Sequence, residues 1–140
     1  MRTNKMLGLL MNIDKDGRSE LHYAALEGNT EKVRALIQSG ALVNLQCKQG
    51  WAALHCAAQA NCSATASLLV EAGADLELRD VFGNTPLCRA TMAFKGNGRV
   101  IKLLLGAGAN PNAQNKSGVS PVSLAYTIGN YNVAQFYEKP

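Results

Sequence analysis

The sequence DVFGNTPL, residues 80–87, joins a glycine turn to a helix start, and variants of it recur along the chain. Four glycines share its period, with spacings of 33, 33 and 35 residues: Gly17, Gly50, Gly83 and Gly118. A second series has spacings of 33 and 35: Gly40, Gly73 and Gly108. A fixed period of this length is typical of repeat architectures. Both series place two extra residues in the third unit.

Each unit contains the signals for two short helices. The first helix is predicted to follow a capping Ser or Thr, with Pro at its first position in two units: Ser19, Thr85–Pro86 and Ser120–Pro121. Small residues come next, at Ala24–Ala25, Ala57–Ala58, Ala90 and Ala125. A second apolar stretch has the helical spacing i, i+3, i+4: Val33, Leu36, Ile37; Ala66, Leu69, Val70; Ile101, Leu104, Leu105. The second glycine series would end these helices in a left-handed cap.

These motifs, with EAGADLELRD (71–80) and GAGANPNAQN (106–115), resemble the ankyrin-repeat family over about residues 14–138. The resemblance implies an all-α fold: a single-domain ankyrin-repeat solenoid of four helix-turn-helix repeats with projecting β-turn fingers. A short N-terminal capping helix is expected at 1–13. The repeats are expected at 14–46, 47–79 and 80–114, and a C-terminal capping repeat at 115–140. Capped ends predict a monomer.

Composition excludes several classes of protein. Hydrophobic residues make up 47% of the chain and charged residues 17%, which excludes a disordered chain. The apolar run at 6–11 is too short for a membrane span or a signal-peptide core. The four cysteines show no CxxC pair, which favours reduced structural thiols. The chain is therefore expected in the cytoplasm, without a membrane partner.

The sequence offers little support for catalysis, a cofactor or a metal. His22 and His55 occupy equivalent positions, but the family resemblance implies that each hydrogen-bonds the backbone of the neighbouring finger. The cysteines lack the spacing of zinc ligands, and KGNGR (95–99) lacks the strand that precedes a phosphate-binding loop. We therefore expect no enzyme and no small-molecule substrate. A net charge of +4 leaves nucleic-acid binding as a remote alternative, since the basic residues form no stripe.

The turn residues that the repeat itself does not need are candidates for contact with a partner protein. At the fingertips these are Lys15, Asp16, Arg18, Lys48, Gln49, Trp51, Val81, Phe82, Asn84 and Lys116. The resemblance adds residues on the inner face of the first helices, namely Tyr23, Gln59, Arg89 and Met92. Tryptophan is enriched among interface hot spots, but Trp51 could instead close the stack against a neighbouring finger. Phe94, in the insertion, is a further contact candidate, and a merely tolerated longer turn is the alternative.

The fingertips carry four basic side chains against one acidic side chain, a balance of +3: Lys15, Arg18, Lys48 and Lys116 against Asp16. This charge predicts a partner with an acidic patch around an apolar pocket. The expected function is a non-catalytic interaction module that binds and inhibits one protein. Residues 83–112 and 118–138 resemble small stand-alone bacterial ankyrin proteins, some of which are immunity proteins against secreted polymorphic toxins. A cognate toxin is therefore the candidate partner, and an adaptor or scaffold is the alternative function.

Overall fold

The computed structural model describes residues 13–127 and 131–138, and this part of the chain contains helices and turns but no β-strand. The helices are α2 (Glu20–Glu27), α3 (Thr30–Gln38), α4 (Ala53–Gln59), α5 (Ser63–Glu71), α6 (Pro86–Met92), α7 (Arg99–Gly106), α8 (Pro121–Thr127) and α9 (Tyr131–Ala134), followed by the 3₁₀ helix η1 (Gln135–Tyr137). The predicted all-α class is confirmed. The capping helix expected at 1–13 lies, apart from Ile13, outside the described residues.

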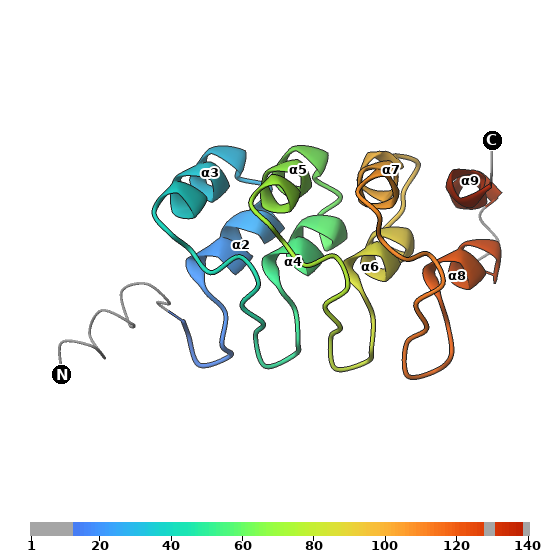
Figure 1. The fold of residues 1–140 in the computed structure, drawn as a ribbon, viewed down its shortest axis with the longest axis horizontal. Coiled ribbons are helices and arrows are strands. Elements are labelled where there is room, and N and C mark those ends of the chain that lie inside the picture. Colours follow the sequence, from blue (N-terminus) through green and yellow to red (C-terminus); the bar gives the residue numbers. More distant parts are fainter. Residues whose placement is uncertain (1–12, 128–130, 139–140) are drawn as a thin grey trace.

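The helices form two layers, and the turns project from one of them (Figure 1). Helices α2, α4, α6 and α8 make the inner row, next to the turns, and α3, α5, α7 and α9 make the outer row, above them in this view. Each helix packs on its partner within the pair, and the helices of successive pairs pack on each other from α2 to α8 in one row and from α3 to α7 in the other. The turns all point to the same side, so their tips line one edge of the molecule.

Local sequence signals set where the helices begin and end. Ser19 caps α2, since its side-chain oxygen accepts from the His22 N–H, and Thr85 caps α6 in the same way ahead of Pro86 at the first turn. The second helices are followed by residues in the left-handed region, Gly40 among them at φ 91°. These are the predicted starts and stops.

The core runs through the stack as equivalent positions in successive units. In the inner row α2, α4 and α6 each bury one leucine with small residues behind it: Leu21, Ala24, Ala25; Leu54, Ala57, Ala58; Leu87, Ala90. Helix α8 buries Ala125. The small side chains let neighbouring helices approach closely at normal packing density. The second helices fill the remaining space with Val33, Ala66, Leu69, Val100, Ile101 and Leu104, all at most 1% exposed. No unit could bury this surface alone, so each repeat depends on its neighbours.

The four fingers, residues 14–18, 47–51, 80–84 and 115–119, are joined side by side by backbone hydrogen bonds. The Lys48 N–H donates to the Asp16 carbonyl at 2.9 Å. Equivalent bonds run from Val81 to Gln49 at 2.9 Å and from Lys116 to Phe82 at 3.0 Å. The regular bonds fix the spacing of the tips and hence the surface they present.

His22 and His55 make the same hydrogen bonds in successive repeats, and these bonds hold neighbouring fingers together, as expected. The two imidazole Nε2 atoms lie 2.7 Å from the Trp51 carbonyl oxygen and 2.9 Å from the Asn84 carbonyl oxygen, on the next finger in each case. Each Nδ1 accepts a backbone N–H, from Ser19 and Ala52 respectively. Both rings are therefore held in the neutral form with the proton on Nε2, and burial lowers the pKa of each.

The insertion of the third unit lies between α6 and α7, but its aromatic residue does not face solvent. Phe94 is 8% exposed and packs edge to face on Phe136, with ring centroids 5.7 Å apart. A Cβ at Gly98 would come within 2.2 Å of the Phe136 ring, so that ring lies directly over the glycine. The expectation that Phe94 is an exposed contact residue is therefore wrong: the insertion closes over the C-terminal helices.

Candidate partner-binding groove

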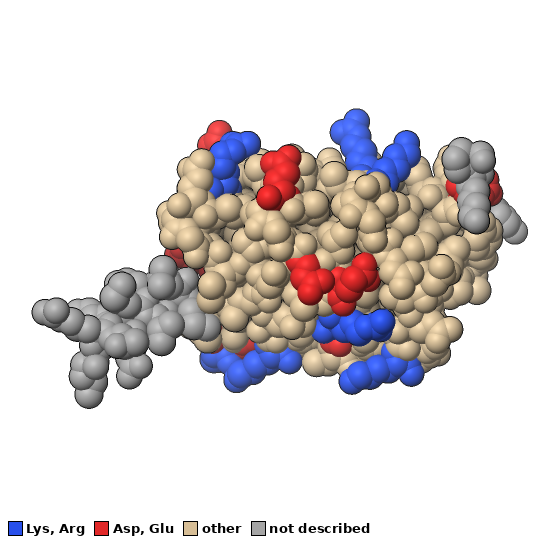
Figure 2. All heavy atoms as spheres, in the orientation of Figure 1, with Lys and Arg blue, Asp and Glu red and all other residues tan. Residues whose placement is uncertain are grey.

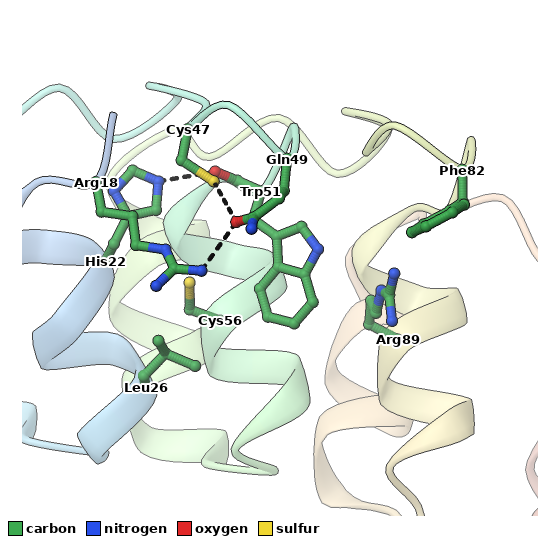
Figure 3. A pocket seen from close by; sticks show the side chains of 9 residues that line it. All are labelled: Arg18, His22, Leu26, Cys47, Gln49, Trp51, Cys56, Phe82 and Arg89. Atoms are coloured by element: carbon green, nitrogen blue, oxygen red, sulfur yellow. Dashed lines mark hydrogen bonds between the residues drawn. The ribbon is translucent and has the colours of Figure 1, made fainter. Parts of the chain in front are cut away.

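A pocket of about 310 Å³ opens on the inner surface, where the first three fingers meet the first helices (Figure 3). It draws residues from the fingers and from α2, α4 and α6. Its lining consists of Arg18, His22, Leu26, Cys47, Gln49, Trp51, Cys56, Phe82 and Arg89. Five of these were predicted as contact residues from the sequence, so the structure brings them together at one place: Arg18, Gln49, Trp51, Phe82 and Arg89.

Trp51 forms the wall in the middle of this pocket. Its ring stacks on His55 with centroids 6.3 Å apart, and the Arg89 guanidinium lies 4.9 Å from the ring centroid. Its side chain is half-buried and remains in the pocket lining. Trp51 therefore combines the two roles weighed from the sequence, since it packs within the stack and offers aromatic surface to the groove.

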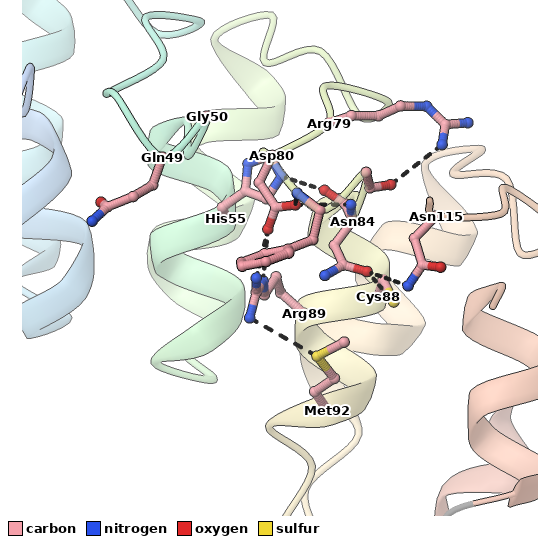
Figure 4. A network of polar contacts seen from close by, with 12 residues as sticks. Gln49, Gly50, His55, Arg79, Asp80, Asn84, Cys88, Arg89, Met92 and Asn115 are labelled. Atoms are coloured by element: carbon pink, nitrogen blue, oxygen red, sulfur yellow. Dashed lines mark hydrogen bonds and ion pairs between the residues drawn. The ribbon is translucent and has the colours of Figure 1, made fainter. Parts of the chain in front are cut away.

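Arg89 is held by an ion pair with a buried carboxylate (Figure 4). Its Nε and Nη2 donate to Asp80 Oδ2 at 3.0 and 2.6 Å. Burial alone would raise the pKa of the Asp80 carboxyl, but bonds from Arg89 and from the N–H groups of Asn84 and Phe82 outweigh it and lower the pKa. Asp80 thus fixes both its own finger and the arginine beside Trp51.

Arg18 is placed differently, because it donates the hydrogen bond that holds it to a neutral group. Its Nη2 donates to Gln49 Oε1 at 2.8 Å, and its guanidinium lies 6.0 Å from the centroid of the Tyr23 ring. Within the described part of the chain it forms no ion pair. The Asp14 carboxylate nearby accepts bonds from the N–H groups of Asp16 and Arg18 and from the Tyr23 hydroxyl, which lower its pKa.

The fingertips beyond the pocket are largely exposed. Phe82 is 63% exposed and Val81 44%. Lys15, Lys48 and Lys116 also face solvent. Figure 2 shows Lys and Arg side chains gathered along the lower edge of the molecule, where Figure 1 places the turns. This edge combines positive charge with exposed aromatic surface, as the sequence predicted.

Asn84 is the fingertip prediction that the structure corrects. It is 4% exposed, and its side-chain oxygen accepts from Asn115 Nδ2 at 2.9 Å and from Cys88 Sγ at 3.3 Å. Its carbonyl is the acceptor for His55. Asn84 therefore joins the third finger to its neighbours and offers no surface to a partner.

The inner-face predictions are placed on accessible surface. Tyr23 is 38% exposed and Met92 43%. Gln59 is also exposed, at the end of α4. Sequence reasoning missed Cys56, which lies at the floor of the pocket. Cys56 follows His55, the histidine that recurs in the repeats. Nothing in the sequence around it distinguishes a residue at a pocket floor from one in the core.

Two thiols in and near the groove, those of Cys56 and Cys88, are not set up as nucleophiles. Burial raises the pKa of Cys56 to about 12 and that of Cys88 to about 11, so both are protonated at neutral pH. Among the described residues, no group of three or more His, Cys, Asp or Glu side chains is arranged to hold a metal ion. The described helices include none long and apolar enough to cross a membrane.

Comparison with known proteins agrees with this architecture. Residues 3–80 and 21–115 match the family described as ankyrin repeats (3 copies). The chain belongs to the ankyrin-repeat family. Similar proteins include neurogenic locus notch homolog protein 1 of Danio rerio, 32% identical over 86% of this chain, and the B-cell lymphoma 3 protein homolog of Mus musculus, 34% identical over 82%. A third is the probable 26S proteasome regulatory subunit p28 of Saccharomyces cerevisiae, 32% identical over 86%.

These ankyrin relatives are longer than the chain. It spans 5% of the zebrafish protein, 26% of the mouse protein and 54% of the yeast protein. The similarity therefore supports the scaffold and its use in binding proteins, which is what an ankyrin stack implies. None of the three names describes an immunity protein or a toxin inhibitor.

Proposed function

We propose that this ankyrin protein binds one partner protein through its groove and fingertips and inhibits it by covering a functional surface. The observation that carries the proposal is the exposed Phe82, which lines the same pocket as Trp51 and two arginines. Aromatic and arginine side chains around a recess are the usual composition of interface hot spots. The proposed role is non-catalytic and needs no cofactor.

The charge of the finger edge supports an acidic partner surface. Lys15, Lys48 and Lys116 face solvent on three fingers, so the positive balance predicted from the sequence lies on one side of the stack. Such charges mainly speed association and select partners, while desolvated aromatic contacts slow dissociation. A secreted toxin that the producing cell must neutralise in its cytoplasm stays our prediction for this partner. An adaptor function remains the second candidate, because an ankyrin stack has two ends and a back surface.

Affinity capture from the native cell lysate tests the proposal, with wild type beside Phe82→Ala and a Trp51→Ala, Phe82→Ala double variant. Phe82 is the cleaner probe because no packing depends on so exposed a ring, whereas the Trp51 ring also supports His55. Leu42→Ala is the matched control, since Leu42 is 49% exposed outside the groove and the fingers. One stoichiometric protein should be retained by wild type and by the control and lost by both Phe82 variants.

The activity of the captured protein then shows whether this chain is an inhibitor or an adaptor. An inhibited partner loses its measured activity at a stoichiometric amount of this chain, and an adaptor's partner keeps its activity while a second protein joins the complex. Capture of the same protein by all variants would show that the binding surface lies elsewhere.

A further inference from the structure

The pocket beside Trp51 contains two arginines, and only one of them forms an ion pair with the described residues. Arg89 is paired with Asp80, whose side chain is fully buried, so that charge is balanced inside the protein. Arg18 is half-buried, and the hydrogen bond that positions it is to the Gln49 amide. A partly desolvated guanidinium gains most from an anion that replaces its lost water.

The groups around Arg18 hold it in place, and the Asp14 carboxylate attracts it without forming an ion pair with it in the described part of the chain. Gln49 fixes one edge of the guanidinium through a 2.8 Å bond, and the centroid of the Tyr23 ring lies 6.0 Å from the guanidinium carbon. The oxygens of Asp14 are engaged by two backbone N–H groups and the Tyr23 hydroxyl. Arginine presents its donors in a planar fork that matches a carboxylate. The arrangement is therefore preorganised for an acidic group that arrives from outside.

The pocket is small, and its floor and wall are apolar. Leu26 and Cys56 form its floor, and the Trp51 ring forms its wall (Figure 3). Its volume of about 310 Å³ is at the lower end of the range for ligand pockets. A space of this size suits one or two side chains rather than a helix or a flat surface.

We propose that this pocket, within the partner-binding function proposed above, is the subsite for an acidic side chain of the partner protein. The carboxylate of an Asp or Glu would pair with Arg18, and an adjacent apolar side chain would lie against Trp51 over Leu26 and Cys56. The pocket thus selects an acidic–apolar pair on the partner, and Arg89 serves to position Trp51.

The test uses random peptides displayed on phage and selected against the full chain. Selected sequences should be enriched in Asp or Glu beside Leu, Ile, Met or Phe. Synthetic versions should change the fluorescence of Trp51, which is the only tryptophan in the sequence and so reports on this pocket alone. Replacing the selected acid by its amide should weaken the dissociation constant about tenfold or more.

Two variants isolate the charge of Arg18. Arg18→Gln removes it, and Gln49→Glu keeps the arginine but supplies an internal carboxylate. Each should weaken peptide binding by about ten- to a hundredfold, as loss of a charge-assisted bond does. Lys32→Gln is the control, because it removes one positive charge from an exposed position on α3, in the outer layer. Thermal unfolding of each variant verifies that the fold is intact.

Three results would overturn the subsite: no peptide selected, selected peptides without an acid, or equal binding by wild type and the Arg18 variant. These results would leave the proposed function standing if the partner is still captured in a Phe82-dependent way. Loss of that capture dependence would instead remove the groove as the binding surface altogether.

Discussion

Among single residues, Cys47 departs from the pattern of its own turn. The equivalent positions in the other fingers are Asp14, Asp80 and Asn115, and each offers a side-chain oxygen to two backbone N–H groups of its finger. Cys47 has no such oxygen, and its thiol lies 3.7 Å from Gln49 Oε1. We expect Cys47→Asn to stabilise the protein by about 0.5–1.5 kcal/mol, because the amide oxygen would accept the same two N–H groups. Urea unfolding measures the change in the free energy of unfolding. The reverse substitution at the equivalent position of the last finger, Asn115→Cys, should lower that free energy.

The two buried histidines make stability depend on pH. The folded state holds His22 and His55 neutral, since protonating Nδ1 would remove the acceptor of a backbone N–H, and burial lowers the pKa of both. The unfolded chain takes up these protons near pH 6.5, so it binds more protons than the folded state below that pH. The free energy of unfolding should be level above pH 7.5 and fall from about pH 6.5 towards 5.

Urea midpoints at several pH values test this, with His55→Gln as the comparison. That variant should show a shallower slope over the same window, since one titrating group is gone. The lowered pKa values of Asp14 and Asp80 affect only more acidic conditions, because those stabilising charges are lost as the pH falls below their ordinary value of 3.8. If the free energy of unfolding depended on pH equally steeply in His55→Gln and wild type, groups other than His55 would cause the dependence.

At the level of elements, the second finger approaches the third, and the third the fourth, so closely that a methyl group cannot fit between them. A Cβ at Gly50 would lie 2.7 Å from the Asp80 Cα, whereas one at Gly118, on the last finger, would meet nothing within 4 Å. The two glycines have similar positive φ angles of 81° and 78°, so the backbone strain of alanine is the same at both. Gly50→Ala should therefore cost about 1–3 kcal/mol more than Gly118→Ala in chemical unfolding. Equal losses would show that the neighbouring finger shifts to accommodate the methyl group at no cost.

Two phenylalanines, Phe94 in the insertion and Phe82 on the third finger, allow stability and binding to be tested separately. Phe94 is 8% exposed under Phe136, and Phe82 is 63% exposed on the third finger. Phe94→Ala should lower the free energy of unfolding by about 3–5 kcal/mol, because it leaves a cavity beneath the C-terminal helices. Phe82→Ala should change stability by no more than about 0.5 kcal/mol and abolish capture of the partner. If Phe94→Ala abolished capture without lowering stability, the insertion would be a contact surface after all.

These elements also show how far the sequence alone could lead. The glycine period, the capping residues and the apolar spacing act within one unit, so helices and finger positions could be predicted from local patterns. Phe94 was misplaced because its partner, Phe136, lies in the last unit, and no local pattern links the two. Asn84 was misplaced for a similar reason, since its burial depends on Asn115 and His55 in neighbouring units. Arg18 and Arg89 differ in role because Arg18 bonds to the Gln49 amide and Arg89 pairs with the Asp80 carboxylate. The repeat pattern does not reveal these partners.

For the whole molecule, the positive finger edge should govern how fast the partner is found. Charges outside a tightly packed contact accelerate encounter and are screened by salt, while the contact itself sets the dissociation rate. A triple variant, Lys15→Gln, Lys48→Gln, Lys116→Gln, should therefore slow association with the captured partner and reduce its dependence on ionic strength. The control replaces three exposed basic residues at or next to α7 by glutamine: Lys95, Arg99 and Lys102.

Both triple variants lower the net charge from +4 to +1, so a difference between them reports on the location of the charge and not on its total. Surface plasmon resonance at several salt concentrations measures the two rates separately. Slower association in the finger variant alone, with dissociation nearly unchanged, is the expected result, because the lysines lie on the fingers and the groove still holds Trp51 and Phe82. Equal slowing in both variants would mean that the partner responds to net charge, and the acidic patch predicted for it would have no counterpart on this edge.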